Sequence, residues 1–228
     1  MTTVYIISAP SGSGKSTLVN EMRTLVPNLD FSISYTTRRP RGSEQNGREY
    51  FFVPVQDFEE MIARGDFLEH ANVFGNYYGT ARRFLEQAQR GEHDLLLDID
   101  VQGAAQIKRK IPDAVSIFIL PPDKKTLEWR LRNRSLDTEE VIQRRLLTAA
   151  KEIENYQRYD YILINDRLED SIDELKAIVL SERLRRSGAT VSNGDKHTLA
   201  TAERCLLPNI RERLQPILAS FALSPTPG

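Results

Sequence analysis

Cysteine is nearly absent from this chain, and its scarcity excludes two kinds of stabilising site. Cys205 is the only cysteine among the 228 residues. One thiol cannot form a disulfide within the chain, and it cannot build a cysteine-based zinc site. Such a chain suits a reducing compartment, and we expect Cys205 to be a small apolar residue that is buried or half-buried.

Long apolar runs and an excess of one charge sign are lacking as well. No run approaches the roughly 18 apolar residues of a membrane span, and the N-terminus has no basic segment followed by a long apolar stretch. The 31 Lys and Arg residues nearly balance the 32 Asp and Glu residues, which leaves a net charge of −1. We therefore expect a soluble cytoplasmic protein that binds neither membranes nor nucleic acid.

Apolar residues make up 40% of the chain, which is enough for the core of one globular domain with insertions. Four runs are apolar at nearly every position, as is typical of strands buried on both faces of a parallel sheet. These runs cover residues 4–7, 95–99, 115–120 and 161–164. Helical patterns, including 102–110 and 126–134, lie between them, so we expect an α/β fold with a doubly wound sheet.

A phosphate-binding loop follows the first apolar run. It reads Ala9, Pro10, Ser11, Gly12, Ser13, Gly14, Lys15, Ser16 and Thr17, and helix-compatible residues come next. Small residues let backbone N–H groups turn toward phosphate oxygens, Lys15 adds a cation, and the Ser16 hydroxyl can join a Mg²⁺ shell. Ala9 stands where the usual pattern has glycine, and alanine tolerates most turn conformations except those with positive φ. The loop predicts a nucleoside triphosphate site at the carboxyl end of a strand.

Two segments interrupt the alternation of strands and helices. Residues 34–93 read as an α+β insertion, with short strands expected at 32–36, 50–53, 68–73 and 76–79 and helices at 57–64 and 81–90. Residues 127–159 read as an arginine-rich, mostly helical insertion with a break at 135–137. Two insertions and one phosphate loop suggest two phosphate-bearing substrates.

Six stretches, in this order along the chain, resemble the guanylate kinase family. They are residues 9–16, 34–41, 50–52, 67–70, 74–80 and 98–103. The resemblance covers about residues 4–186 and implies a P-loop NTPase three-layer fold with a parallel core sheet, an inserted GMP-binding region and a helical lid. The implied division is a core of 1–33, 94–126 and 160–186, a GMP-binding insertion of 34–93, a lid of 127–159 and an extension of 187–228.

The activity that this resemblance implies is transfer of the γ-phosphoryl group of Mg-ATP to GMP, and to dGMP, in purine nucleotide metabolism and GMP recycling. Guanine presents N1–H and NH₂ donors and an O6 acceptor, so a selective pocket needs carboxylates and a hydroxyl or amide. The resemblance places Glu69 and Asp100 as acceptors around the base, with Ser34 and Thr80 as hydroxyl partners. It assigns the GMP phosphate to Arg38, Arg41, Tyr50 and Tyr78.

The resemblance also implies how charge on the transferring group is neutralised. Lys15 bridges the β- and γ-phosphates, while Ser16 and Asp98 support Mg²⁺ directly or through water. Arg130, Arg134 and Arg145 resemble lid arginines that close over ATP, so the expected catalytic residues are Lys15, Arg38, Arg130, Arg134 and Arg145. The nucleophile is a phosphate oxygen that is largely anionic at neutral pH, so no general base is needed. We expect the three histidines to be structural or exposed: His70, His93 and His197.

Two regions are less well defined by the sequence. Asn165 and Asp166 resemble the family's Asn-Asp pair near the adenine of ATP, and the less favoured alternative is that Asn165 simply closes a turn. Ser135 stands where the family usually has glycine, which affects lid kinetics only if that position needs positive φ.

The segment after Arg186 lies outside the resemblance. Small and polar residues over 187–195 indicate a flexible linker, and apolar residues then recur at roughly helical spacing as far as Phe221. We expect Pro208 and Pro216 to interrupt this pattern and to divide it into two short helices. Their apolar stripe is expected to pack on the core or on a second subunit, and the oligomeric state stays open.

Three functional classes compete for this sequence, and a guanylate kinase is favoured. A guanylate-kinase-like binding module without catalysis would have no need of Lys15, Ser16, Asp98 and an arginine-rich lid. A kinase acting on ribose bisphosphate would not need Glu69 and Asp100 as base-reading carboxylates.

Overall fold

The structure is a computed structural model, and it describes residues 2–73, 75–134 and 138–223. The chain forms two compact units. The first comprises Met1–Ile7 and Pro27–Val115, and the second comprises Ser8–Val26 and Ser116–Gly228. These two units do not correspond to the four parts expected from the sequence (core, insertion, lid and extension), so that division stays a prediction. Within the described ranges, no helix is long and apolar enough to cross a membrane.

The main sheet is parallel, as the sequence predicts. Its strand order is β2-β7-β1-β8-β9. The expected runs are strands β1 (Val4–Ser8), β7 (Asp94–Asp98), β8 (Val115–Leu120) and β9 (Tyr161–Ile164). Val4 pairs with Leu95 in the β1–β7 register, and Ile117 pairs with Tyr161 in the β8–β9 register. Nearly every residue of these strands is buried, which explains why the runs are apolar without alternation.

One strand of this sheet was not expected from the sequence. Strand β2 (Leu29–Phe31) pairs in parallel with β7 at the edge of the sheet. It has only three residues, and the charged Asp30 separates its two apolar ones. Such a short edge strand carries too little periodicity to stand out.

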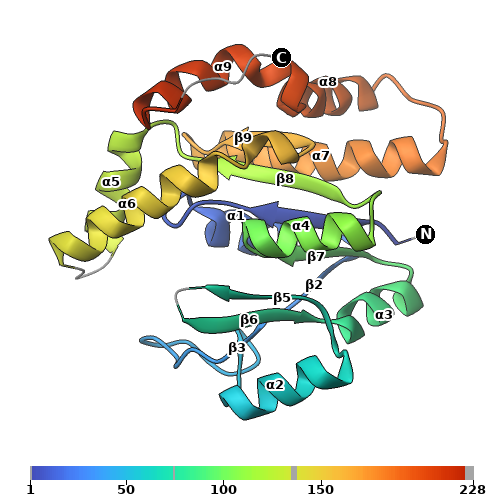
Figure 1. Cartoon of the computed structure of the whole chain (residues 1–228). Helices are drawn as coiled ribbons and strands as arrows, with labels where there is room; N and C mark the ends of the chain where they lie inside the picture. Colours follow the sequence, from blue (N-terminus) through green and yellow to red (C-terminus); the bar gives the residue numbers. More distant parts are fainter. Residues whose placement is uncertain (1, 74, 135–137, 224–228) are drawn as a thin grey trace. The chain divides into compact units, whose positions relative to one another are not determined.

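The first unit also contains a four-stranded sheet with the order β4-β3-β6-β5, which confirms the expected α+β segment. Its strands are β3 (Tyr35–Thr36), β4 (Phe51–Phe52), β5 (Phe67–Val73) and β6 (Asn76–Ala81), and its helices are α2 (Val55–Arg64) and α3 (Arg82–Gly91). The Phe58 ring of α2 is buried and stacks on Phe67 and Tyr77, with centroids 4.5 and 5.3 Å apart. Helix α4 (Val101–Lys110) follows β7 and lies along β5 (Figure 1).

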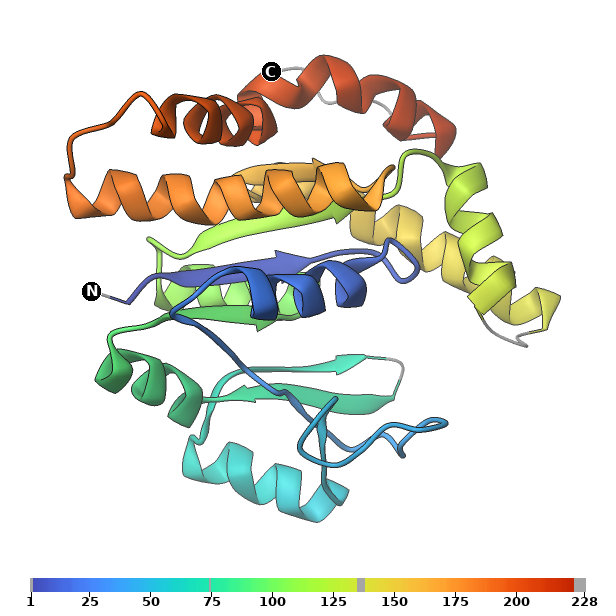
Figure 2. The ribbon, with the colours of Figure 1, turned by 180° about the vertical axis from the view of Figure 1, so that it is seen from behind.

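The second unit is mostly helical. It holds α1 (Lys15–Leu25), α5 (Lys124–Arg134), α6 (Glu139–Ile153), the short 3₁₀ helix η1 (Tyr156–Arg158) and α7 (Leu168–Ser187). Helices α1 and α7 lie side by side (Figure 2). The Asp160 carboxylate ties β9 to β8 by accepting hydrogen bonds from the backbone N–H and the hydroxyl of Ser116, both at 2.8 Å.

The C-terminal extension forms two helices, as expected: α8 (Asp195–Cys205) and α9 (Leu207–Ser220). Between them the chain meets the edge strand β9, where Leu206 bridges Tyr161 and the Leu207 N–H donates to the Asp160 carbonyl oxygen at 3.0 Å. Most of the apolar stripe is buried within the second unit, in agreement with the first of its two expected positions. Leu199 and Leu206 are half-buried, and the buried members are Ala202, Ile210, Leu214, Ile217, Leu218 and Phe221.

The expected interruption at Pro216 is wrong. Pro216 lies inside α9, whereas Pro208 occupies its first turn, where no helical N–H partner is required. The helix continues past Pro216 because its neighbours Leu214, Ile217 and Leu218 are buried, and that burial offsets one lost hydrogen bond.

Candidate active site

The phosphate loop connects β1 to α1 in the conformation that its small residues permit. Gly12 and Gly14 have φ of +91° and +87°, which residues with a side chain rarely adopt. The Ser13 N–H donates to the Pro10 carbonyl oxygen at 3.1 Å and closes a tight turn. Ala9 is not among the described residues with positive φ, so alanine at the first position of the loop is unstrained. The loop ends at the N-terminus of α1, where backbone N–H groups favour a bound anion.

Helix α5 supports this loop by close packing. A methyl group added at Gly12 would lie 2.9 Å from Leu127 Cδ1 and 3.0 Å from Leu131 Cδ2, and both leucines are buried on α5. Nothing in the sequence identifies these leucines as neighbours of the loop. Their apolar character marks them only as core residues, and the contact depends on the tertiary arrangement.

Asn165 holds the other side of the loop. Its side-chain Nδ2 donates to the Ser13 carbonyl oxygen at 2.7 Å, and a methyl group at Gly14 would collide with the same nitrogen. The Asn165 carbonyl oxygen in turn accepts from Arg130 NH2 at 3.0 Å. The structure therefore brings together three parts of the expected ATP site: the loop, Asn165 and Arg130. Asn165 supports the loop backbone, whereas its contact with adenine stays a prediction.

The other expected ATP-site residues lie on the loop and on the two helices α5 and α6. Ser11, Ser16 and Thr17 are exposed, and Lys15 is half-buried. Arg145 is half-buried on α6, which packs against α5. Arg134 is the last residue of α5, and both its side chain and Ser135 lie outside the described residues.

Among the described residues assigned to ATP, two have a buried polar atom without a hydrogen-bond partner. The two atoms are Ser13 Oγ in the loop and Arg130 NH1 on α5. Buried polar atoms are paired in the great majority of cases, so each exception calls for an explanation. Both atoms belong to residues that the sequence assigns to ATP, and a phosphate supplies oxygen acceptors.

In the first unit, Glu69 and Asp100 lie close together, as expected. Glu69 is on β5 and only 3% exposed, and it faces Gly103 in the first turn of α4. Asp100 caps that helix by accepting from the Gly103 N–H at 2.9 Å. The charge of Asp100 contributes to raising the pKa of Glu69, so the two carboxyl groups lie within electrostatic reach.

Burial is the largest cause of the raised Glu69 pKa, which reaches about 7. Thr80 on β6 pairs with Glu69 in the sheet register. Its side-chain and backbone donors lie near the Glu69 carboxyl group and partly offset the rise in the Glu69 pKa. Its fully buried hydroxyl nevertheless has no hydrogen-bond partner of good geometry among the described residues. A buried carboxyl group and an unpaired hydroxyl thus sit next to each other on neighbouring strands.

The residues expected around the GMP phosphate form one aromatic and cationic cluster. Arg38 is 9% exposed, and its guanidinium carbon lies 5.3 Å from the centre of the Tyr50 ring. The Tyr50 and Tyr78 rings meet edge to face at 5.9 Å, and Tyr78 interacts with the Arg38 guanidinium. Arg41 is exposed on the loop that follows. Ser34 is buried just before β3, where its carbonyl oxygen accepts from the Phe51 N–H at 2.9 Å.

Glu44 joins this cluster, although the sequence does not point to it. Its carboxylate accepts from both terminal nitrogens of Arg38, at 2.9 and 3.0 Å. A single carboxylate in a polar segment usually indicates only a solvated surface.

The described histidines fit the structural or exposed roles expected of them. His93 Nδ1 lies 2.9 Å from Asp30 Oδ1, His70 is half-buried on β5, and His197 is exposed on α8.

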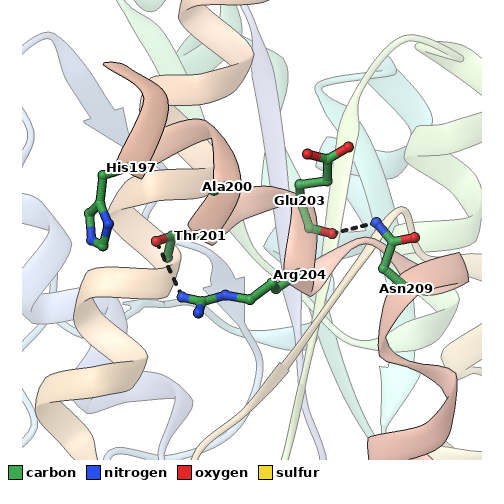
Figure 3. A pocket seen from close by; sticks show the side chains of 6 residues that line it. All are labelled: His197, Ala200, Thr201, Glu203, Arg204 and Asn209. Carbon is green, nitrogen blue, oxygen red and sulfur yellow. Dashed lines mark hydrogen bonds between the residues drawn. The ribbon is translucent and has the colours of Figure 1, made fainter. Parts of the chain in front are cut away.

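His197 also lines a surface pocket with Ala200, Thr201, Glu203, Arg204 and Asn209 (Figure 3). Arg204 donates to Thr201 Oγ1 at 3.3 Å within α8, and Asn209 of α9 donates to the Glu203 carbonyl oxygen of α8 at 2.8 Å. Both side chains therefore stabilise the two C-terminal helices. Residues expected to bind nucleotides are not among those lining this pocket.

The residues expected to support Mg²⁺ provide oxygen donors, which is the ligand type that the ion prefers. Ser16 is exposed in the first turn of α1, and Asp98 is half-buried at the end of β7. Over the described residues there is no group of three or more His, Cys, Asp or Glu side chains that could hold a metal ion. A hydroxyl and a carboxylate fit an ion that is bound mainly through ATP phosphates and water. Because Ser16 and Asp98 belong to different units, their joint role stays a prediction.

Comparison with known proteins agrees with this geometry. A family model described as guanylate kinase matches residues 1–182. The guanylate kinase of Koribacter versatilis (strain Ellin345) is 59% identical over 230 residues, which cover 99% of this chain and 99% of that protein. The guanylate kinase of Escherichia coli (strain K12) is 51% identical over 187 residues, covering 81% of this chain and 90% of that protein.

Solved structures give the same result. The crystal structure of guanylate kinase from Anaplasma phagocytophilum is 34% identical, with a TM-score of 0.67, over 79% of this chain and 86% of that one. Helices α8 and α9 lie beyond the 182 residues of the family model, yet the match to the Koribacter protein covers nearly the whole chain. The chain belongs to the guanylate kinase family.

Proposed function

We propose that this chain transfers the γ-phosphoryl group of Mg-ATP to GMP or dGMP and releases ADP with GDP or dGDP. Its family membership and the curated relatives named guanylate kinase support this activity. The reaction serves purine nucleotide metabolism and GMP recycling. We place it in the cytoplasm, a reducing compartment that suits the single buried thiol of Cys205.

One observation carries the choice of guanine: the buried Glu69 carboxyl group, with the unpaired Thr80 hydroxyl beside it and Asp100 nearby. Guanine N1–H and NH₂ need acceptors, and carboxylates provide them. Adenine has an acceptor at N1 and would leave these buried groups unpaired. Discrimination of this hydrogen-bonding kind reaches roughly 10⁴ to 10⁵.

The acceptor phosphate is assigned to Arg38, Arg41, Tyr50 and Tyr78, and this assignment is supported by the cluster that three of them form. Arginine grips phosphate oxygens with two parallel hydrogen bonds, and tyrosine hydroxyls add donors on stiff rings. The attacking oxygen belongs to this phosphate and is largely deprotonated at neutral pH. The protein therefore has to position this oxygen rather than to remove a proton from it.

The donor phosphates are assigned to residues 9–17, with Lys15, Arg130, Arg134 and Arg145 neutralising charge on the transferring group. Two observations support this assignment: Ser13 Oγ and Arg130 NH1 are buried without a hydrogen-bond partner among the described residues, and Arg130 NH2 donates a hydrogen bond to the Asn165 carbonyl oxygen. When Mg²⁺ is bound with ATP it neutralises charge on the β- and γ-phosphates, and Ser16 and Asp98 are the residues that would hold it.

The test is to replace the carboxyl groups that are thought to read guanine. We expect Glu69→Gln and Asp100→Asn to reduce kcat/KM for GMP by at least 100-fold each and to bring GMP and AMP closer together, because each amide presents a donor to a guanine donor. Asparagine still caps a helix well, so Asp100→Asn preserves the start of α4. The affinity for ATP is expected to stay within about twofold.

The matched control is Glu59→Gln, which removes an exposed carboxylate from α2 of the same unit. We expect it to leave all kinetic constants unchanged. Unaltered use of GMP by both site variants would overturn the assignment of the base. A wild-type protein that phosphorylates no acceptor would instead favour a non-catalytic binding module.

A further inference from the structure

Arg38 and Glu44 form a two-point ion pair within the cluster assigned to the GMP phosphate. We propose that Glu44 is a positioning residue that fixes the Arg38 guanidinium and the Arg41 backbone in the arrangement that receives the acceptor phosphate. This inference rests on the proposed function, because it assigns Arg38 to the GMP phosphate.

The geometry of the pair leaves Arg38 little freedom. NH1 and NH2 donate to the two carboxylate oxygens of Glu44 at 2.9 and 3.0 Å, and NH1 also donates to the Arg39 carbonyl oxygen at 2.8 Å. The guanidinium further lies 5.3 Å from the Tyr50 ring centre and 5.7 Å from that of Phe52. Glu44 therefore uses the end of the guanidinium, and none of these three hydrogen bonds uses its Nε edge. A phosphate oxygen can approach that edge beside Tyr78, which also interacts with the guanidinium and is itself assigned to the phosphate.

Glu44 is itself fixed by the segment that carries Arg41. Its Oε2 accepts from the Arg41 N–H at 2.7 Å, and its own N–H donates to the Arg41 carbonyl oxygen at 3.0 Å. One carboxylate thus accepts three hydrogen bonds and links the two arginines that are assigned to the phosphate. A mobile surface carboxylate would not be expected to hold three donors at once.

The charge of Glu44 is maintained by these contacts. Partial burial alone would raise the pKa of Glu44, but the hydrogen bonds from Arg38 and from the Arg41 backbone outweigh it and lower the pKa below its ordinary value. For Arg38, burial opposes the charge, while Glu44 and Tyr78 favour it and leave its pKa raised. Both members of the pair therefore stay charged at neutral pH.

A competing interpretation is that Glu44 occupies the place of the phosphate and has to leave before GMP binds. Release would break three hydrogen bonds with charged or backbone donors, and it would leave a nearly buried guanidinium to be re-paired. The two interpretations predict opposite changes in KM for GMP when Glu44 loses its charge, so one experiment separates them.

The experiment compares steady-state kinetics of wild type, Glu44→Gln and Glu44→Asp, with thermal unfolding of each protein as a check on folding. We expect Glu44→Gln to raise KM for GMP about tenfold while KM for ATP stays within about twofold, because only the acceptor phosphate loses an oriented arginine. Glu44→Asp keeps the charge but shortens the side chain, and we expect a KM for GMP between those of wild type and Glu44→Gln.

A double-mutant cycle shows whether Glu44 acts through Arg38. Arg38→Lys alone should raise KM for GMP, and adding Glu44→Gln should then raise it by a smaller factor than Glu44→Gln does in the wild type, because lysine cannot make the two-point contact and only the contact with the Arg41 backbone is left to lose. Full additivity would mean that Glu44 acts by some other route and would overturn the proposal. So would an unchanged or lowered KM for GMP in Glu44→Gln.

The control variant is Glu49→Gln. Glu49 lies on the same segment and also accepts a backbone N–H, from Gln45 at 2.7 Å, but its ion-pair partner is Arg48 rather than Arg38. We expect its KM for GMP to equal that of wild type. Failure of the proposed function would appear differently, because the wild type itself would then not phosphorylate GMP.

Discussion

Gly103 and Glu69 lie in contact, and a side chain at position 103 would displace the Glu69 carboxyl group. A methyl group on Gly103 would lie 2.5 Å from Glu69 Oε2, closer than non-bonded heavy atoms approach a β-carbon in folded proteins. The same glycine donates its backbone N–H to Asp100. One residue in the first turn of α4 therefore determines where both carboxyl groups assigned to guanine can lie.

Gly103→Ala is expected to impair GMP recognition. Displacing the buried Glu69 side chain should raise KM for GMP at least fivefold and lower the free energy of unfolding by about 1–2 kcal/mol. Steady-state kinetics and urea unfolding measure the two effects. Gly91→Ala is the control, because the nearest atom to a methyl group there is a His93 ring atom at 3.5 Å. If both variants keep the wild-type KM for GMP, then Glu69 does not depend on this contact.

Glu69 should make the stability of the protein depend on pH. Its pKa is about 7 in the folded state and about 4.5 ordinarily, so the folded state holds the proton more tightly. The contribution of Glu69 to stability should therefore be largest below about pH 4.5 and should fall by about 3 kcal/mol as the pH rises to about 7.

Glu69→Gln removes this dependence, because glutamine does not titrate. The variant should gain stability relative to wild type as the pH rises from 5 to 8, and urea unfolding at several pH values measures the difference. The difference cancels the contributions of the other titrating groups. A constant difference across this range would contradict a raised Glu69 pKa.

Gly12→Ala is expected to damage the ATP site alone. The substitution combines a φ of +91° with close contacts to Leu127 and Leu131, so the loop has to move. We expect KM for ATP to rise more than tenfold, with KM for GMP changed by less than about twofold. Gly188→Ala is the control, since its φ is +64° but no atom lies within 4 Å of the added methyl group. Equal ATP constants for both variants would show that the contact with α5 has no effect on the loop.

The C-terminal extension should contribute to the stability of the second unit. Leu214 on α9 is 1% exposed, so Leu214→Ala should lower the free energy of unfolding by about 2–4 kcal/mol. Leu147→Ala on α6 is the matched control, because Leu147 is 68% exposed and its loss should change stability by less than about 0.5 kcal/mol. Urea unfolding of both variants is the measurement. If the extension were not packed on the second unit, Leu214→Ala and Leu147→Ala would lower the free energy of unfolding by equally small amounts.

The sequence predicts the buried strands well because their signal is local. A run such as β8 is apolar at every position except Ser116, and its bounds of Val115–Leu120 are those expected. Strand β2 and the continuation of α9 through Pro216 are not predicted, because both depend on neighbours that are distant in sequence.

The same distinction holds for the site. Glu69 and Asp100 were expected from family resemblance, and the structure places them together. Glu44 and the leucines beside Gly12 were not expected, since a carboxylate and two apolar residues carry no local signal of what they contact. Residues that act through another side chain can be found only once the tertiary contacts are known.

The central claim is that this chain is a guanine-selective, ATP-dependent kinase. The most direct test measures ADP formation from Mg-ATP with GMP, dGMP, AMP, CMP and ribose 1,5-bisphosphate, each in a parallel reaction with the wild-type protein. We predict fast turnover confined to GMP and dGMP. Comparable turnover with AMP or CMP, turnover with the sugar phosphate alone, or no turnover with any acceptor would contradict the claim.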